Sequence, residues 1–394
     1  MTPRRSIVVV ALGSTQTIAW ASSYYMPAIL GAPIAAALHL SSNVFFGFFS
    51  AALLLSAAVG PWVGRLIDRH GGRLMLAASN LVIAAGLLIL AAAHGVAALA
   101  IAWFVLGLGL GMGLYDPAFA ALTWLYGREA RGAITGITLI AGFASTVSWP
   151  LSAFLLHEFG WRAACLGWAG LNLLLAAPVN WLVIPRHGMP APVSQVAAAP
   201  PMAEPSRGAM PILAFFFSAT WFVQGAMAAH LPGLLQAAGA SATAAIAAAS
   251  LVGPAQVGAR MVEFGLLRSF HPVSSARIAS VLHPLGAALL AVFGAPAIVA
   301  FALLHGAGNG MIMIAKGTLP LALFGPRAYG LRSGVLSAPA RVLQSTAPFL
   351  FGLLLGRVGV GAVWLTAGLC LAAFASLFAL RSRTLPVVDP VVSD

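Results

Sequence analysis

The sequence predicts an all-α membrane protein with twelve transmembrane helices arranged as two pseudo-symmetric six-helix bundles. Of its 394 residues, 61% are hydrophobic and only 7% are charged, whereas roughly a quarter of a soluble domain is charged. The hydrophobic residues form twelve runs close to the ~20 residues that cross a bilayer as a helix. Arginine gathers on one side of these runs. The composition argues against a soluble enzyme, a disordered chain and a secreted disulfide scaffold.

The twelve runs divide evenly between the two halves of the chain. They are too long for the strands of a transmembrane β-barrel, which span a bilayer in ~10 alternating residues. Helices are therefore expected throughout. The runs are residues 7–30, 44–64, 74–93, 97–125, 132–156 and 163–184 in the first half, and 210–235, 242–267, 278–293, 295–323, 333–355 and 359–380 in the second.

The arginines predict the orientation in the membrane. With the N-terminus in the cytoplasm, fifteen arginines fall at the cytoplasmic face, and two, Arg162 and Arg357, fall at the other. Cytoplasmic loops are rich in arginine and lysine. We therefore expect a multi-pass protein of a bacterial-type inner membrane with both termini cytoplasmic. The net charge of +12 needs no nucleic-acid partner, because the basic residues form no single face.

A proline-rich break separates the two halves. Residues 185–209 contain six prolines and predict an extended or flexible linker. Residues 126–132 and 324–330 are similar and lie 198 positions apart, which indicates two repeats of six helices, as in transporters that rock two halves about a central site. The predicted organisation is an N-terminal bundle (1–184), a cytoplasmic linker (185–209), a C-terminal bundle (210–381) and a cytoplasmic tail (382–394).

The loop between the second and third runs carries the clearest motif. Residues 64–73 read GRLIDRHGGR, which resembles the signature G-x-L-x-D-R-x-G-x-R of the major facilitator superfamily. The resemblance covers the whole chain and implies a secondary active transporter in which this loop locks the cytoplasmic side closed. Glycine permits a tight turn, and an aspartate can accept from arginines or from a helix N-terminus. The resemblance assigns this gating role to Gly64, Asp68, Arg69, Gly71 and Arg73.

Other segments resemble the monocarboxylate and oxalate/formate branch of that superfamily. Residues 107–137 hold a glycine-rich fourth helix and a basic loop, and residues 160–162 read GWR. Two features depart from the branch. The acidic, tryptophan-rich opening of helix one is absent, and Gln256 replaces an aspartate, which puts proton coupling there in doubt. Drug/proton antiporters carry the motif G-P-x-x-G-G in helix five. Residues 148–153 stand in that place here and read SWPLSA, which has the proline but not the glycines. Efflux of an amphipathic or toxic compound is the alternative function.

Arg260 is the main candidate for a substrate contact. In that branch, the corresponding helix carries an acidic residue, then three further residues, then an arginine that binds the substrate carboxylate. The region around Arg260 resembles this pattern. An arginine about 12 Å above the cytoplasmic end of its helix needs an anion, and its fork suits a carboxylate. Glu263, on the same helix face, could instead neutralise it permanently. The predicted substrate-binding residues are Arg260, Tyr115, Gln256, Asn309 and Gln224.

Asp116 and Glu263 are the candidates for proton coupling, because ionisable groups at bilayer depth are costly and tend to be functional. Asp116 could carry a proton, or it could be a structural acceptor or the partner of a basic residue. Lys316 could face Asp116 across a cavity, or it could extend to the cytoplasmic interface. Arg341 is expected to be structural.

No pattern indicates a metal, a cofactor or a catalytic residue. His230, His283 and His305 could carry protons, but they are not spaced as metal ligands. No phosphate-binding loop occurs, so the chain is not expected to be an enzyme or to use ATP. The expected partners are a small, anionic substrate and membrane lipid, and a monomer is expected. A receptor or scaffold that uses the transporter fold without moving solute is a third possibility.

Overall fold

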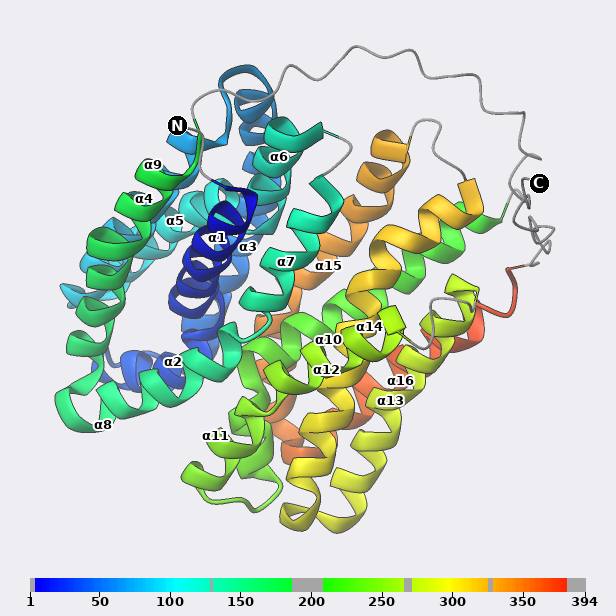
Figure 1. Ribbon diagram of the computed structural model, residues 1–394. Coiled ribbons are helices and arrows are strands. Elements are labelled where there is room, and N and C mark those ends of the chain that lie inside the picture. The colour runs from blue at the N-terminus through cyan, green and yellow to red at the C-terminus, as the bar shows by residue number, and fades with distance from the viewer. Residues whose placement is uncertain (1–3, 128–129, 186–207, 266–270, 325–328, 381–394) are drawn as a thin grey trace, which may run out of the picture.

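The computed structural model describes residues 4–127, 130–185, 208–265, 271–324 and 329–380. Every regular element in these ranges is a helix, so the chain is an all-α protein. Figure 1 shows two groups of helices side by side, the first half of the chain in blue to green and the second in yellow-green to red. The predicted linker and tail lie almost wholly outside the described residues.

In the first half, α4 packs against α5, α3 packs against both α5 and α6, and α1 packs against α7. The described elements of this half are α1 (Arg5–Trp20), π-helical η1 (Ala21–Tyr25), α2 (Pro27–Ala37), α3 (Ser42–His70), α4 (Gly72–Ala91), α5 (Val96–Gly113), α6 (Tyr115–Tyr126), α7 (Ala130–Ala141), α8 (Ala144–Leu171), π-helical η3 (Asn172–Ala176) and α9 (Ala177–Val183).

In the second half, α10 packs against α15, α13 against α14, and α12 against α14. The described elements are α10 (Ala209–Ala237), α11 (Ala242–Ser250), α12 (Val252–Gly265), α13 (Pro272–Phe293), the 3-10 turn η4 (Ala295–Ala297), α14 (Ile298–Phe324), α15 (Tyr329–Val358), the 3-10 turn η5 (Gly359–Ala362) and α16 (Val363–Ser376).

Nine stretches of the described chain are long and apolar enough to cross a membrane. Two of them, Gly132–Val183 and Val335–Ser376, each cover most of two predicted runs. The first is broken at Gly160, where φ is 79°, and the second passes through η5. The first predicted run lies in α1, η1 and α2, outside these nine stretches. Each predicted run thus corresponds to helix, while the exact number of crossings stays a prediction.

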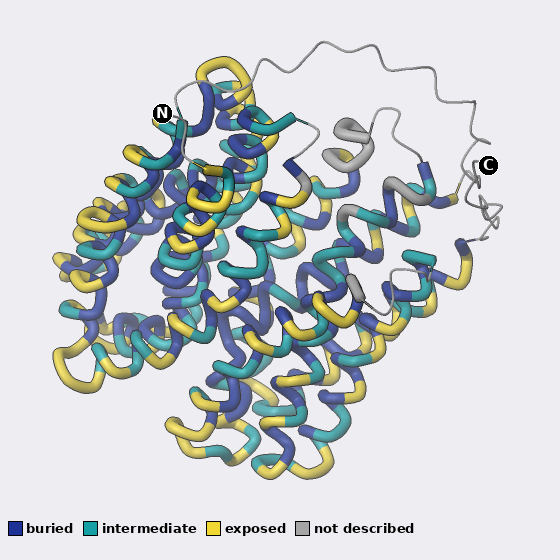
Figure 2. The backbone as a smooth tube through the Cα atoms, in the orientation of Figure 1, coloured by how far each residue is buried: buried dark blue, intermediate teal, exposed yellow. Residues whose placement is uncertain are grey.

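The burial pattern is that of a protein surrounded by lipid. Large apolar side chains lie on the outside: Leu174 is 77% exposed, Val292 71% and Trp62 56%. Figure 2 shows the buried backbone concentrated where helices face one another. Polar residues such as Asn80 and Asn172 are instead fully buried. Hydrocarbon offers no partner for such groups, so the fold must supply one.

A chain of neutral hydrogen bonds runs through the first half and fills that need. Asn80 Nδ2 donates to Asn172 Oδ1 at 2.9 Å, and Asn180 Nδ2 donates to Asn80 Oδ1 at 2.8 Å. Thr15 Oγ1 donates to Asn180 Oδ1 at 2.8 Å, and Asn172 Nδ2 donates to Ser22 Oγ at 2.9 Å. The network joins α1, η1, α4, η3 and α9 into one body.

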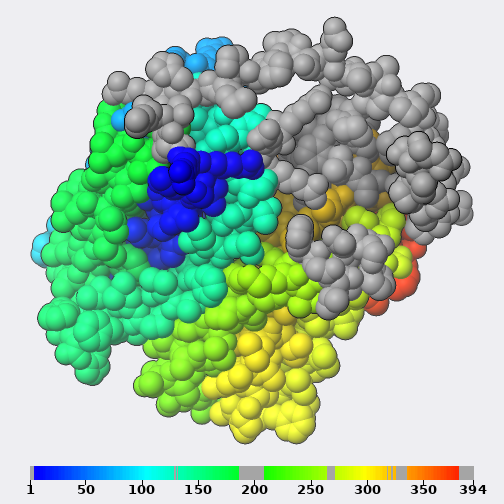
Figure 3. All heavy atoms as spheres, viewed as in Figure 1, coloured from blue at the N-terminus to red at the C-terminus, as the bar shows by residue number. Residues whose placement is uncertain are grey.

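The two halves meet along three sets of helices: α3 with α15, α8 with α11 and α12, and α2 with α10. Figure 3 shows the seam between α8 and the α11–α12 region at the surface. Thr146 Oγ1 of α8 donates to the carbonyl of Ser250 in α11 at 2.8 Å. The backbone N–H of Phe349 in α15 donates to Ser50 Oγ of α3 at 3.2 Å. These contacts are what a rocking motion between halves would have to change.

Glycine brings α4 and α6 close together at the start of α4. A Cβ on Gly72 would overlap the Cβ of Ala121 and lie 3.0 Å from its Cα. Gly71, at the preceding turn, has a φ of 80°, where glycine is favoured. Gly64, one helix earlier, has nothing within 4 Å of a Cβ position.

We expect Gly72→Ala to destabilise the protein by about 1–3 kcal/mol, because two packed backbones must move apart. Gly64→Ala is the matched control, and we expect it to be neutral or stabilising by up to about 1 kcal/mol. Thermal unfolding of both variants in detergent measures the difference. An unchanged melting temperature for Gly72→Ala would contradict the close approach of α4 and α6.

Candidate functional site: a charged cavity between the halves

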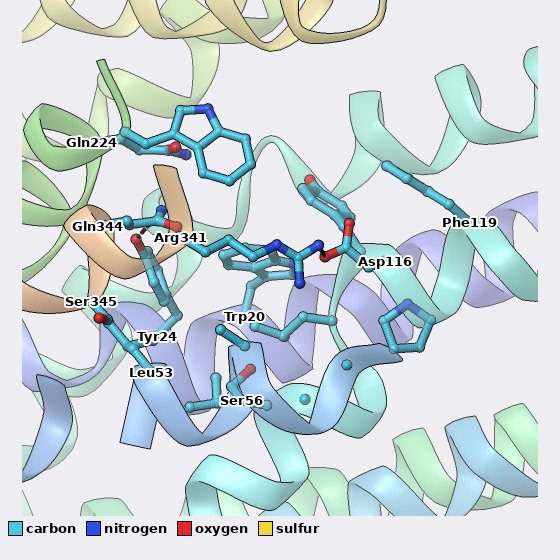
Figure 4. A pocket seen from close by; sticks show the side chains of 18 of the residues that line it. Trp20, Tyr24, Leu53, Ser56, Asp116, Phe119, Gln224, Arg341, Gln344 and Ser345 are labelled. Atoms are coloured by element: carbon cyan, nitrogen blue, oxygen red, sulfur yellow. Dashed lines mark hydrogen bonds and ion pairs between the residues drawn. The ribbon is translucent and has the colours of Figure 1, made fainter. Parts of the chain in front are cut away.

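A cavity of about 120 Å³ lies between the two halves, and Figure 4 shows the side chains that line it. The first half contributes α1, η1, α3, α5 and α6, and the second half contributes α10, α14 and α15. Neither half alone encloses the cavity, so its shape depends on their relative position. The polar and aromatic lining residues are Trp20, Tyr24, Ser56, Tyr115, Asp116, Phe119, Trp221, Gln224, Lys316, Arg341, Gln344 and Ser345.

Three charged side chains meet in this cavity. Arg341 Nη2 of α15 donates to Asp116 Oδ2 of α6, and Lys316 Nζ of α14 lies 3.9 Å from Asp116 Oδ1. Figure 4 shows Arg341 reaching across to Asp116. Side-chain exposures are 48% for Asp116, 29% for Lys316 and 28% for Arg341. Two cations share one carboxylate, so the group has one positive charge in excess.

Local structure places Asp116 at this point. α5 ends at Gly113, Leu114 is extended with ψ of −161°, and α6 begins at Tyr115. Asp116 therefore lies in the first turn of α6, where the helix dipole favours an anion. Pro117 is tolerated there because early helical positions need no intrahelical N–H bond. Gln16 Nε2 donates to the freed carbonyl of Gly113 at 2.6 Å.

Aromatic rings form one wall of the cavity. The ring centroid of Trp20 lies 4.9 Å from Tyr24 and 4.8 Å from Tyr115. Gln344 Nε2 of α15 donates to the Tyr24 hydroxyl at 3.0 Å, which joins the two halves again. On the other side, Lys316 Nζ lies 4.3 Å from the Trp221 ring centroid, a cation–π contact. The cavity thus combines apolar faces with a concentrated positive charge.

The predicted substrate residues fall at three places. Tyr115 and Gln224 line the central cavity. Gln256 and Asn309 line a second space of about 10 Å³, and Gln224 borders both spaces. Arg260 lines neither of them.

The guanidinium of Arg260 is occupied by the protein itself. Nη1 donates to the carbonyl of Thr138 at 2.7 Å, Nε to the carbonyl of Gly310 at 3.4 Å, and Nη2 to Gln256 Oε1 at 3.4 Å. Thr138 belongs to α7 of the first half, so Arg260 links the two halves. Tyr115, also of the first half, lies near Arg260.

Glu263 is buried near Arg260 but does not form an ion pair with it within 4.0 Å. Ser275 of α13 lies near Glu263, and Glu263 Oε2 has no hydrogen-bond partner among the described residues. The permanent Arg260–Glu263 pair that the sequence allowed is therefore not present in this conformation.

The residues of the predicted gating motif lie at the end of α3 and the start of α4. Asp68 and Arg69 are exposed, and Asp68 makes no ion pair with the described part of the chain. Gly71 forms the turn, with its Cβ position 2.9 Å from Trp124 Cη2. The Arg73 guanidinium stacks on Trp181 of α9, 4.6 Å from the ring centroid.

Sequence reasoning missed Arg341 as a site residue, and it left Lys316 undecided. The structure brings both to Asp116. The available signal was the 198-residue repeat, because the counterpart of Asp116 is Ile314, two positions before Lys316. No comparable signal pointed to Arg341, because its contact depends on how α15 lies against α3 and α6.

Twelve hydrophobic runs, two helical halves and a polar cavity between them define a membrane transporter of small molecules. Residues 12–280, more than half of the chain, match the Major Facilitator Superfamily, and the chain belongs to this family. No curated protein sequence gives a significant match.

Solved structures with the same fold cover nearly the whole chain. One is the human organic anion transporter MFSD10 (TETRAN), with a TM-score of 0.67 and 15% identity, covering 95% of this chain and 100% of that one. Another is a bacterial homologue of the human lysosomal transporter Spinster, in inward-facing occupied and unoccupied forms. Their TM-scores are 0.64 and 0.66, each with 15% identity and with 96% of this chain and 95% of that one covered. At this identity the likeness concerns the fold.

A double-mutant cycle tests the charge cluster. We expect Asp116→Asn combined with Arg341→Gln to show a coupling of about 0.5–1 kcal/mol in thermal unfolding, because the pair is half-exposed. The matched cycle of Asp116→Asn with Lys316→Gln should give a smaller coupling, because those atoms are 3.9 Å apart. Equal couplings, or none in the first cycle, would contradict this geometry.

Proposed function

We propose that this protein is a secondary active transporter that moves a small organic anion, of the monocarboxylate class, by alternating access. The observation that carries the proposal is the charge of the cavity: Lys316 and Arg341 share the single carboxylate of Asp116. An anion that enters would give the second cation a partner. Guanidinium offers a carboxylate two parallel hydrogen bonds, and ammonium adds a point charge.

The size of the cavity supports a small substrate. About 120 Å³ is well below the ~300–1,000 Å³ of pockets for drug-sized ligands. The aromatic wall of Trp20, Tyr24 and Tyr115 suits the apolar part of a short-chain acid. The same wall favours the alternative function, efflux of an amphipathic compound, but the excess positive charge favours an anionic one. MFSD10, which has the same fold, is an organic anion transporter, and this agrees with the choice of an anion.

Contacts along α3 support the direction in which the cavity opens. Near the start of α3, Ser50 accepts from the backbone of Phe349. Further along, Gly60 lies level with the charge cluster, its Cβ position 3.3 Å from Arg341 Nη1. Asp68, about 27 Å beyond Ser50, is exposed. With both termini in the cytoplasm of a bacterial-type inner membrane, the conformation is inward-facing.

The gating motif then acts in the outward-facing conformation, in which the cytoplasmic side is closed. When the cytoplasmic side closes, Asp68 gains charge partners across the interface, while Arg69 and Arg73 supply the basic side of the lock. Transport by a single chain is coupled to protons or to exchange, and Asp116 and Glu263 are the carboxylates available for coupling. In this view Arg260, held by Thr138, changes partners as the halves move, which agrees with a role close to the substrate.

Ligand-induced stabilisation tests the substrate class. The probes are formate, acetate, lactate, pyruvate, oxalate and succinate, with ethanolamine as a cationic control. At a concentration of 100 times Kd, a bound anion should stabilise the purified protein by about 2.7 kcal/mol. Lys316→Gln and Arg341→Gln should each reduce this shift, whereas Arg162→Gln, outside the cavity, should retain it. Stabilisation by ethanolamine but by none of the acids would overturn the anion proposal.

A second test concerns the gate. Asp68→Asn should leave the free energy of unfolding within about 0.5 kcal/mol of the wild type, because an exposed residue with no ion pair in the described part of the chain contributes little. Counterflow in proteoliposomes should nevertheless slow, because the closed state loses a charge partner. Full-rate counterflow by a correctly inserted Asp68→Asn protein would remove the gating role.

A further inference from the structure

The second half contains a buried pair of histidines that the charge cluster does not use. His283 of α13 and His305 of α14 are 3% and 4% exposed. Their Nδ1 atoms lie 3.0 Å apart, and His283 Nε2 lies 2.9 Å from Thr366 Oγ1 of α16. We propose that this pair is the proton-binding site of the transporter and that His305 Nε2 is the atom that receives the proton. The inference rests on the proposed function and deepens it.

Hydrogen-bond directions determine where the protons lie. The hydroxyl of Thr366 lies 2.8 Å from the carbonyl of Val363, which can only accept, so we assign the hydroxyl proton to that bond and let the Thr366 oxygen accept from His283 Nε2–H. A neutral His283 then has a bare Nδ1. That atom can only accept, so His305 carries its proton on Nδ1. The remaining nitrogen, Nε2 of His305, is left as a bare base.

The position of His305 gives that base a route to the substrate. His305 lines the small space of about 10 Å³, which has room for about one water. Gln224 borders this space and also lines the central cavity with Lys316 and Arg341. The other polar residues of the small space are Tyr25, Gln256 and Asn309. A proton can therefore pass from the central cavity to His305 by way of a water beside Gln224.

Within the described chain, the space beside His305 offers no fixed counter-charge. The titratable group that lines this space with His305 is Tyr25 of η1, and Arg260 of α12 donates to Gln256 Oε1, another lining residue, at 3.4 Å. No carboxylate lines the small space within the described chain. Glu263, about two turns after Gln256 on α12, lies near Ser275 instead. The nearby fixed charge, that of Arg260, has the same sign as a protonated histidine.

Proton binding is consequently linked to the anion. A hydronium ion gives its proton to His305 Nε2, a new N–H bond forms, and a neutral water remains. The resulting imidazolium keeps its Nδ1–H bond to His283. Burying this charge alone is costly, whereas a substrate carboxylate in the adjoining cavity compensates it. Anion and proton therefore load together and leave together, which is symport.

Wild-type protein tests the neutral proton arrangement without substrate and the protonated one with it. Magic-angle-spinning NMR of the full chain, labelled with ¹⁵N-histidine in lipid, should show a coupling between two Nδ1 atoms across one hydrogen bond. One ring of that pair should be the neutral Nδ1–H form. Between about pH 8 and pH 5, the range in which histidine charges, its Nε2 should become protonated when the best-stabilising acid is present. An Nε2–H form in both rings, or a His305 that stays neutral throughout, would overturn the inference.

Transport by variants tests the coupling. The probe is whichever of the six acids gives the largest counterflow in wild-type proteoliposomes. In His305→Gln, we expect the ratio of pH-driven accumulation to counterflow to fall at least tenfold. The exposed control His157→Gln should keep the wild-type ratio. A wild-type ratio in His305→Gln would overturn the proton site and leave anion transport standing. If none of the six acids supports counterflow by the wild-type protein, the proposed function itself fails. The NMR result still decides the proton arrangement of the histidine pair.

Discussion

The hydrocarbon surroundings offer buried polar groups no partner, so the protein itself must supply one, and the rest of the structure follows from this constraint. It makes helices the structure of every described element, since helices satisfy their own backbone. It also explains why the interior of the first half holds a neutral network of asparagines and hydroxyls. Asn80 bonds both to Asn172 and to Asn180, so that α4, η3 and α9 are held together by neutral groups.

The charged side chains of the cavity lie between the two halves, whereas these neutral groups lie inside one half. The Asp116 cluster lies between the halves, where both can contribute a side chain and where half of the aspartate remains exposed. Arg260 also crosses the interface, by donating to the carbonyl of Thr138. A rigid neutral interior and a charged interface suit a protein whose two halves rock about a central site. The interactions that must change during transport are those at the interface.

Some of the predicted site residues line the cavity, and others do not. Asp116 was singled out because a carboxylate in an apolar run is costly, and it does lie in the cavity with Tyr115 and Gln224. Arg260 was chosen by the same reasoning, yet its guanidinium is occupied by two carbonyls and Gln256. Depth in a helix shows that an arginine needs partners, but it does not say which ones. Arg341 was missed because its partner, 225 residues away, lies in the other half.

The amino-acid sequence by itself determined the all-α class, the order of the helical runs and the membership in a transporter superfamily. These depend on local properties: run length, hydrophobicity and one short loop motif. Tertiary structure alone decided that Asp116 faces Arg341 and Lys316, that Arg260 reaches Thr138, and that His283 faces His305. The physical reason is that a helix restricts its own side chains to a face. Which face meets which neighbour depends on how separate helices pack, and one sequence read along its length does not contain that pairing.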